Sequence, residues 1–235
     1  MSAATPLIRD PRAIPVIGVD EHLPAVPPTA LGEAAVRARF ARSDAWTPMF
    51  SGDGQRLGTP GRPPAAAAVL VPLVLRPDGL HVLLTRRTDH LRDHAGQISF
   101  PGGRAEPGED DPAQTALREA EEEVGLSPEQ VEVIGRMPAY TTITSFVVTP
   151  VVALVRPPLT LQLDPFEVAE AFEVPLSFLM TPAFHRRHRF ESDGQQRHFL
   201  SMPWQGRGGD GELREYFIWG ATAAMLRNLY HFLSA

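Results

Sequence analysis

One segment, from Asp111 to Gly125, constrains the fold of this chain more than any other, because both ends of a helix can be read from it. Asp111 is a good N-cap, Pro112 suits the first helical position, and Gln114 is placed for a capping box. Gly125 suits a left-handed C-cap. The sequence therefore predicts a helix over residues 112–124.

This helix has an apolar face with an acidic face beside it. At about 100° per residue, five apolar positions share one arc: Ala113, Ala116, Leu117, Ala120 and Val124. Glu119, Glu122 and Glu123 share the adjoining arc, whereas Glu121 lies on the opposite flank. Like charges at this spacing destabilise an isolated helix by roughly 0.2–0.5 kcal/mol per pair. A hard divalent cation such as Mg²⁺ removes that repulsion, because it prefers oxygen ligands.

The acidic residues are concentrated around this helix. Eight of the 28 carboxylates lie between Glu106 and Glu123, and Arg118 is the one basic residue among them. A solvated acidic face is the simple interpretation. However, a short predicted strand and the glycine pair Gly102-Gly103 precede the helix. A strand, a glycine loop and an acidic helix together can hold a metal ion and a pyrophosphate.

Short apolar runs on both sides of the helix predict strands. Residues 66–75 and 80–85 flank a Pro-Asp-Gly turn and predict a hairpin. Further strands are predicted at 97–100, 131–137, 146–155, 184–190, 197–203 and 214–218, helical turns at 166–180, and a last helix at 221–233. Strands before and after one central helix indicate a mixed α/β fold with a sheet packed on helices.

Residues 1–64 have a different composition from the rest of the chain. They contain ten of the 24 prolines and one amphipathic stretch, over residues 30–43. We expect an N-terminal Pro-rich extension with one helix, followed by a main domain over residues 65–235. The extension would pack on the main domain or on a second subunit, which makes a homodimer a further expectation.

Composition excludes several kinds of chemistry. The chain of 235 residues has no cysteine, and its 22 basic residues are all arginine, so thiolate and lysine nucleophiles are excluded. The net charge of −6 argues against a nucleic-acid partner. No segment is typical of a membrane helix or a secretory signal, and we expect a cytoplasmic protein without a membrane partner.

The acidic helix resembles a known family motif. The run Arg118-Glu119-Ala120-Glu121-Glu122-Glu123-Val124-Gly125-Leu126 fits the second half of the Nudix box, R-E-U-x-E-E-x-G-U, at every specified position. Gly103 and Glu109 fit its opening, G-x5-E. The gap between Glu109 and Arg118 has one residue more than the box. The coenzyme A (CoA) pyrophosphatase branch of the Nudix hydrolases carries this insertion.

The segment ahead of the box resembles the same branch. Its signature is similar to L-L-T-x-R-x3-L-R-x-H-x-G-x3-F-P-G-G, and the chain reads LLTRR from Leu83 and LRDHAGQISFPGG from Leu91. Further similarity occurs at residues 146–150, 167–179 and 218–222. The resemblance therefore runs from about Ala66 to the C-terminus, and residues 1–64 match no motif.

The resemblance implies a fold, a reaction and a metal. The fold would be the Nudix α/β/α sandwich, with a mixed β-sheet between helices. The reaction would be hydrolysis of the CoA pyrophosphate to 4′-phosphopantetheine and adenosine 3′,5′-bisphosphate, with Mg²⁺ or Mn²⁺ as cofactor. Alternatives are a Nudix pyrophosphatase acting on NADH, ADP-ribose or another nucleoside diphosphate derivative, and a binding module without catalysis.

The resemblance also implies roles for individual residues. Glu119, Glu122 and Glu123 would bind the metal, and one of these glutamates or a later loop carboxylate would accept the proton of the attacking water. Arg118 would orient the glutamates. Gly102 and Gly103 would admit the pyrophosphate. The candidates for binding the 3′-phosphate of CoA are Arg86, Arg87 and Arg92.

Overall fold

A computed structural model gives the fold of the chain and describes residues 8, 10–42, 46–53, 64–90, 96–192 and 194–235. The main sheet consists of β2 (Ala65–Arg76), β3 (Gly79–Arg87), β4 (Ile98–Ser99), β5 (Gly102–Arg104), β6 (Val131–Arg136), β7 (Tyr140–Thr141), β8 (Phe146–Val155) and β9 (Val168–Pro175). Its central order is β4-β3-β2-β8-β6, while β5 pairs with β2, β7 with β8, and β9 with β3. Among the strands that the structure describes, only β2 and β8 pair in parallel and the other pairs are antiparallel, so the sheet is mixed, as predicted.

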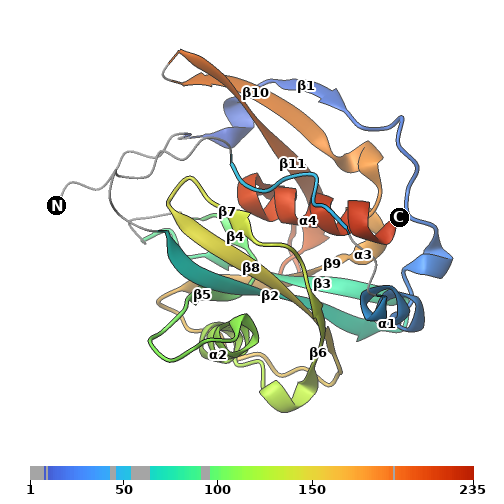
Figure 1. Cartoon of the computed structure of the whole chain (residues 1–235), viewed down its shortest axis with the longest axis vertical. Coiled ribbons are helices and arrows are strands. Elements are labelled where there is room, and N and C mark those ends of the chain that lie inside the picture. The colour runs from blue at the N-terminus through green and yellow to red at the C-terminus, as the bar shows by residue number, and fades with distance from the viewer. Residues whose placement is uncertain (1–7, 9, 43–45, 54–63, 91–95, 193) are drawn as a thin grey trace.

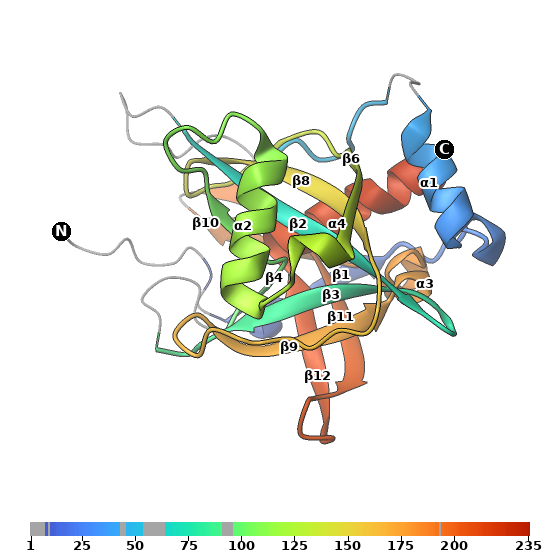
Figure 2. The same ribbon diagram turned by 90° about the horizontal axis from the view of Figure 1, so that it is seen from below.

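Helices cover both faces of this sheet (Figures 1 and 2). On β8, Val151, Ala153 and Val155 pack with α2 (Pro112–Val124), whereas the alternate residues Val152 and Leu154 pack with α4 (Gly220–Leu233). Successive strand residues point to opposite faces, so one apolar run fills two cores. The predicted α/β/α sandwich with a mixed sheet is confirmed.

A second sheet covers the far side of α4 (Figure 1). It has the order β1-β10-β11-β12, from β1 (Val16–Val19), β10 (Arg186–Ser192), β11 (Gln195–Arg207) and β12 (Leu213–Trp219). The three C-terminal strands were predicted, but not that they form a sheet of their own. No strand was predicted over residues 16–19, which form β1, the fourth strand of this sheet.

The helical turns predicted over residues 166–180 are wrong for most of that segment. Residues 168–175 form β9, which pairs antiparallel with β3, and helix follows only in α3 (Leu176–Leu179). Val168, Glu170, Phe172 and Val174 are buried, and the residues between them are more exposed. This alternation is that of a strand. It gains its hydrogen bonds from a partner far away in the sequence.

Residues before the main sheet pack closely on the rest of the chain. The predicted helix is α1 (Glu33–Ala41), and Val26, Leu31 and Val36 belong to the core that contains α4. Short 3₁₀ helices lie at Pro11–Ala13, Pro28–Ala30, Pro128–Gln130 and Pro182–Phe184. No helix within the described residues is long and apolar enough to span a membrane.

A buried charge pair connects this N-terminal part to the C-terminal helix. Arg227 of α4 lies 3.1 Å from Asp20, and the two residues are 3% and 5% exposed. Arg227 also contacts Nδ1 of the fully buried His185, whose Nε2 hydrogen-bonds the Leu179 carbonyl at 2.8 Å. An arginine can only donate, so His185 accepts at Nδ1 and donates at Nε2. The ring is therefore neutral.

We predict that Asp20→Asn destabilises the protein strongly, because it leaves the buried Arg227 guanidinium without a counter-charge. Removing one partner of a buried pair costs about 3 kcal/mol or more. Urea unfolding at pH 7 measures the loss. The matched control is Glu132→Gln, which breaks an ion pair to Arg37 on the exposed surface and should change stability much less. Equal effects of the two variants would contradict this role of Asp20.

A second prediction concerns pH. Burial lowers the pKa of His185 from its ordinary value to about 4. The unfolded chain therefore binds a proton near pH 6.5 that the folded protein resists, and stability falls as pH decreases from 6.5 to 4. His185→Gln keeps one acceptor and one donor but cannot titrate. The stability difference between wild type and this variant should change by up to about 3 kcal/mol across that window, at about 1.4 kcal/mol per pKa unit. A constant difference would show that His185 does not titrate there.

Candidate active site

The helix α2 has the bounds that its sequence predicts. The Asp111 side chain accepts a hydrogen bond from the Ala113 N–H at 2.7 Å, and Gly125 has a φ of 69° in the left-handed region. Its apolar face lies on the sheet, with Ala116, Ala120 and Val124 in the core. This packing places the carboxylates of the last two turns of α2 beside β5.

Two glutamates of α2 lie against the glycine strand. Glu123 is 5% exposed, and one of its oxygens accepts a hydrogen bond from the Gly102 N–H at 3.1 Å. A Cβ on Gly103 would lie 2.5 Å from Cδ of Glu119, so this carboxylate occupies the space that a side chain at residue 103 would need. Gly102 has a φ of 153°, and a Cβ there would lie 2.6 Å from Cα of Val69. Packing on β2 therefore requires glycine at position 102, whereas a side chain at position 103 would displace the Glu119 carboxylate.

Arg118 joins the acidic residues of the helix to the loop before it. Its guanidinium lies 2.8 Å from Glu109, 2.9 Å from Glu119 and 2.9 Å from Glu122. Hydrogen bonds from Arg118 and from the Glu106 N–H lower the pKa of Glu109 to about 2. Glu109 is therefore a fixed anion that holds Arg118 in position. Glu122 is the most exposed of the three helix glutamates, with 60% of its side chain accessible.

The consecutive arginines of β3 lie on opposite faces of the sheet. Arg87 lies on the α2 side, at 3.9 Å from both Glu123 and Glu167. Arg86 lies on the other side, at 3.4 Å from Glu170. The pleat of a strand makes neighbours diverge in this way. The third candidate, Arg92, lies outside the described residues.

Glu167 is a carboxylate of this site that the sequence analysis did not identify. It directly precedes β9, and its carbonyl accepts the Thr88 N–H at 3.0 Å, which fixes the backbone beside the end of β3. Its charge acts on both Glu119 and Glu123. The missing signal was the pairing of β9 with β3, because helical turns at 166–180 would not have brought residue 167 here.

The electrostatics of the site favour a cation. Burial, partly offset by the Gly102 N–H and Arg87, raises the pKa of Glu123 to about 7. Burial also raises the pKa of Glu119, against the opposing effect of Arg118. Buried carboxylates with raised pKa values lack sufficient positive charge nearby. Oxygen ligands of this kind fit a hard divalent ion such as Mg²⁺.

The carboxylates do not converge into a finished metal site. In the part of the chain that the structure describes, no three acidic or histidine side chains are close enough to hold a metal ion. Glu122 turns towards Arg118, and Glu119 shares that arginine. A bound cation would have to draw these side chains away from Arg118.

Comparisons with known proteins identify the family of this chain. The model of the NUDIX domain family matches residues 64–192. The chain is similar to the protein named uncharacterized Nudix hydrolase NudL. The Yersinia enterocolitica protein is 42% identical over 166 residues, which cover 69% of this chain and 78% of the relative. The Escherichia coli K12 protein is 42% identical over 165 residues, which cover 69% and 80%.

Solved structures are more distant. A Caenorhabditis elegans Ap4A hydrolase aligns with a TM-score of 0.42 and 24% identity, over 50% of this chain and 85% of that one. A MutT/nudix family protein from Enterococcus faecalis aligns with a TM-score of 0.44 and 16% identity, over 75% and 64%. The family assignment rests on sequence, through the family model and the relatives at 42% identity. The chain belongs to the Nudix hydrolase family.

Proposed function

We propose that this Nudix hydrolase cleaves the pyrophosphate of CoA, with Mg²⁺ or Mn²⁺, to 4′-phosphopantetheine and adenosine 3′,5′-bisphosphate. The observation that carries the proposal is the segment from Leu83 to Gly103, which resembles the CoA pyrophosphatase signature. The two described parts of this segment, residues 83–90 and 96–103, both contribute a residue beside the carboxylates. Arg87 lies 3.9 Å from Glu123, and Gly103 contacts the Glu119 carboxylate. Residues 91–95 in its middle are outside the described residues.

Hydrolysis requires a water molecule to attack a phosphorus atom that already carries negative charge. When bound, divalent ions neutralise the charge that develops and lower the pKa of bound water. Glu119 and Glu123 would hold such ions through carboxylates that β5 and Arg118 keep in place. Glu122 would join them by turning from Arg118. The role of Arg118 is to position these glutamates, because its guanidinium is already shared among three carboxylates.

The reaction also requires a general base that accepts the proton of the attacking water. Glu167 is the best candidate for this role, because its charge acts on both Glu119 and Glu123 and 47% of its side chain is accessible. Its one charged partner within the described residues is Arg87, at 3.9 Å. A carboxylate this far from its cationic partner can still move towards a substrate.

The first test is substrate choice. With Mg²⁺ or Mn²⁺, the purified protein should cleave CoA to two phosphate monoesters without releasing inorganic phosphate. The measurement is the kcat/KM for a panel of CoA, NADH, ADP-ribose and nucleoside triphosphates. Faster turnover of NADH or ADP-ribose than of CoA would assign the enzyme to another branch of the family. No turnover of any member would favour a binding module.

The second test separates metal ligands from bystanders on α2. Glu119→Gln, Glu122→Gln and Glu123→Gln each remove one charge and keep the side-chain volume. We expect each to lower kcat by roughly 100-fold or more, the scale of a lost electrostatic stabiliser or base. Glu121→Gln is the matched control, because Glu121 is an exposed glutamate of the same helix. It should change kcat little.

The same variants also report on the protein without metal. Removing the charge of Glu123 relieves the burial of a carboxylate, while the amide oxygen of glutamine can still accept from the Gly102 N–H. Melting in the presence of a chelator should therefore show Glu123→Gln to be at least as stable as wild type. If Glu121→Gln damages catalysis as much as the others, or if Glu119→Gln and Glu123→Gln remain near wild type, the metal assignment fails.

A further inference from the structure

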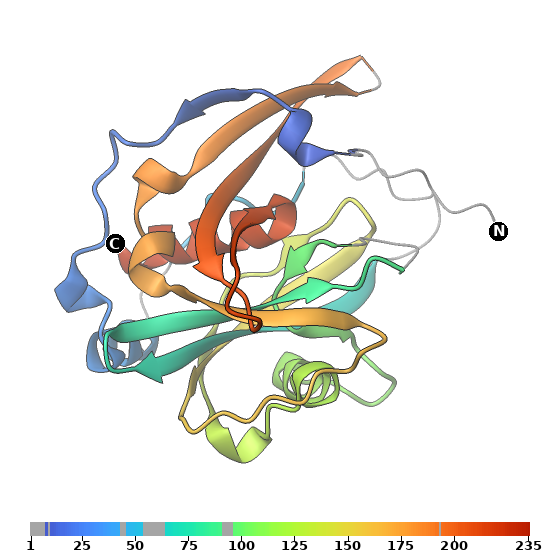
Figure 3. The same ribbon diagram turned by 180° about the vertical axis from the view of Figure 1, so that it is seen from behind.

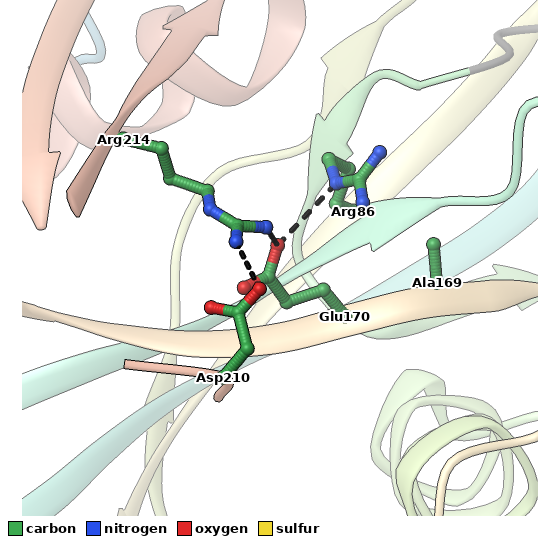
Figure 4. A pocket seen from close by; sticks show the side chains of 5 residues that line it. All are labelled: Arg86, Ala169, Glu170, Asp210 and Arg214. Carbon is green, nitrogen blue, oxygen red and sulfur yellow. Dashed lines mark hydrogen bonds and ion pairs between the residues drawn. The ribbon is translucent and has the colours of Figure 1, made fainter. Parts of the chain in front are cut away.

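A second charged site lies on the face of β3 and β9 that is turned away from α2 (Figure 4). Its cavity has a volume of about 310 Å³ and is lined by Arg86, Ala169, Glu170, Asp210 and Arg214. The residues come from β3, β9, β12 and the loop before β12. That loop is the tip of the long β11–β12 hairpin, which reaches down to β9 (Figure 3).

Glu170 is the fixed centre of this cavity. It is 8% exposed, and its oxygens accept a hydrogen bond from the Tyr216 hydroxyl at 2.7 Å and weaker ones from Arg86 and Arg214, each at 3.4 Å. Phe172 stacks on Tyr216 with ring centroids 3.8 Å apart, which holds the tyrosine in place. One buried carboxylate therefore faces two guanidinium groups.

The two arginines have hydrogen-bonding capacity left over. Among the described residues, the terminal nitrogens of Arg86 make no hydrogen bond, and one of them lies 3.9 Å from Asp89, whose side chain is 83% accessible. Arg214 donates one terminal nitrogen to Glu170 and the other to Asp210. The two arginines carry two positive charges, and the carboxylates of Glu170 and Asp210 balance them. Guanidinium groups arranged in this way suit a phosphate.

Asp210 differs from Glu170 in how firmly it is held. It lies at the hairpin tip with 56% of its side chain accessible, and its other oxygen accepts the Glu212 N–H at 3.0 Å within the same turn. An exposed ion pair contributes little to stability. Asp210 can therefore exchange with an anion from solution at low cost, whereas the buried Glu170 cannot.

We propose that Arg86 and Arg214 form a binding site for a phosphate monoester of the nucleotide substrate, and that Asp210 occupies it in the free enzyme as an internal competitor. This inference rests on the proposed function in one respect, which is that the phosphate would be the 3′-phosphate of CoA. The neighbouring residues Arg87 and Arg86 place one guanidinium on each face of the sheet, Arg87 beside Glu123 and Arg86 beside Glu170.

The test is nucleotide binding to the full-length protein with Mg²⁺, measured by calorimetry. The probes are adenosine 3′,5′-bisphosphate and adenosine 5′-monophosphate, neither of which has a pyrophosphate to hydrolyse. Asp210→Asn keeps the acceptor for the Glu212 N–H and removes the competing charge. It should tighten binding of the bisphosphate about two- to fivefold, the scale of an exposed ion pair. Arg214→Gln should weaken it about tenfold, through loss of a charge-assisted contact. Neither variant should change binding of the monophosphate.

Glu212→Gln is the matched control, because it removes the same charge from the same hairpin tip without a contact to Arg214. Its binding should equal that of wild type. Unchanged binding in Asp210→Asn, or an equal gain in Glu212→Gln, would overturn the role of Asp210 as a competitor. Inorganic phosphate that competes as strongly as the bisphosphate would overturn the assignment to a nucleotide.

A kinetic measurement separates this inference from the proposed function. In Arg214→Gln, the ratio of kcat/KM for CoA to that for dephospho-CoA should fall about tenfold, the expected scale for one charge-assisted contact. An unchanged ratio in an enzyme that hydrolyses CoA would overturn the phosphate site alone. If wild type does not hydrolyse CoA but still binds the bisphosphate through Arg214, the proposed function fails and the phosphate site stands.

Discussion

The candidate active site depends on the close contact between carboxylates of α2 and the glycines of β5. The carboxylate of Glu119 occupies the space beside Cα of Gly103, and one turn later Glu123 accepts the Gly102 N–H. A side chain at position 103 would displace the Glu119 carboxylate from this place. Because this packing also excludes water, it raises the pKa values of both glutamates. The burial of Glu119 and Glu123 against β5 is therefore also the reason that this site favours a cation.

The sheet serves two charged sites because its strands are pleated. On β3, Arg87 belongs to the carboxylates beneath α2, and Arg86 belongs to the cavity beneath the β11–β12 hairpin. On β9, the buried Glu170 faces the same cavity, while Glu167 lies beside α2, just before the strand begins. The second sheet contributes the far wall of the cavity. It is therefore a part of the proposed substrate site as well as a cover for α4.

The ends of the chain are joined by charge as well as by apolar packing. Asp20 and Arg227 are both buried, and separating them would leave a buried charge without its partner. Together with β1 in the second sheet, this pair fixes the N-terminal residues on α4 and β10. The apolar residues of the extension, such as Val36, fill the core of the same chain.

The sequence alone determined the features that depend on neighbours along the chain. Capping groups lie within a turn of the residues they cap, so Asp111 and Gly125 were enough to give both ends of α2. The same applies to the β2–β3 hairpin with its tight turn. The arc shared by Glu119 and Glu123 follows from helix periodicity, and the Nudix resemblance follows from residues in one continuous segment.

Tertiary structure decided what depends on partners far away in the sequence. Residues 168–175 are a strand because β3 supplies their hydrogen bonds, and this pairing brings Glu167 to the glutamates of α2. Helix periodicity placed Glu122 with the other two glutamates but could not show that Arg118 draws it outward. Alternation along β3 implies that Arg86 and Arg87 diverge, but which of them meets the carboxylates depends on which face α2 covers. That choice is made by the packing of whole elements, and no local pattern records it.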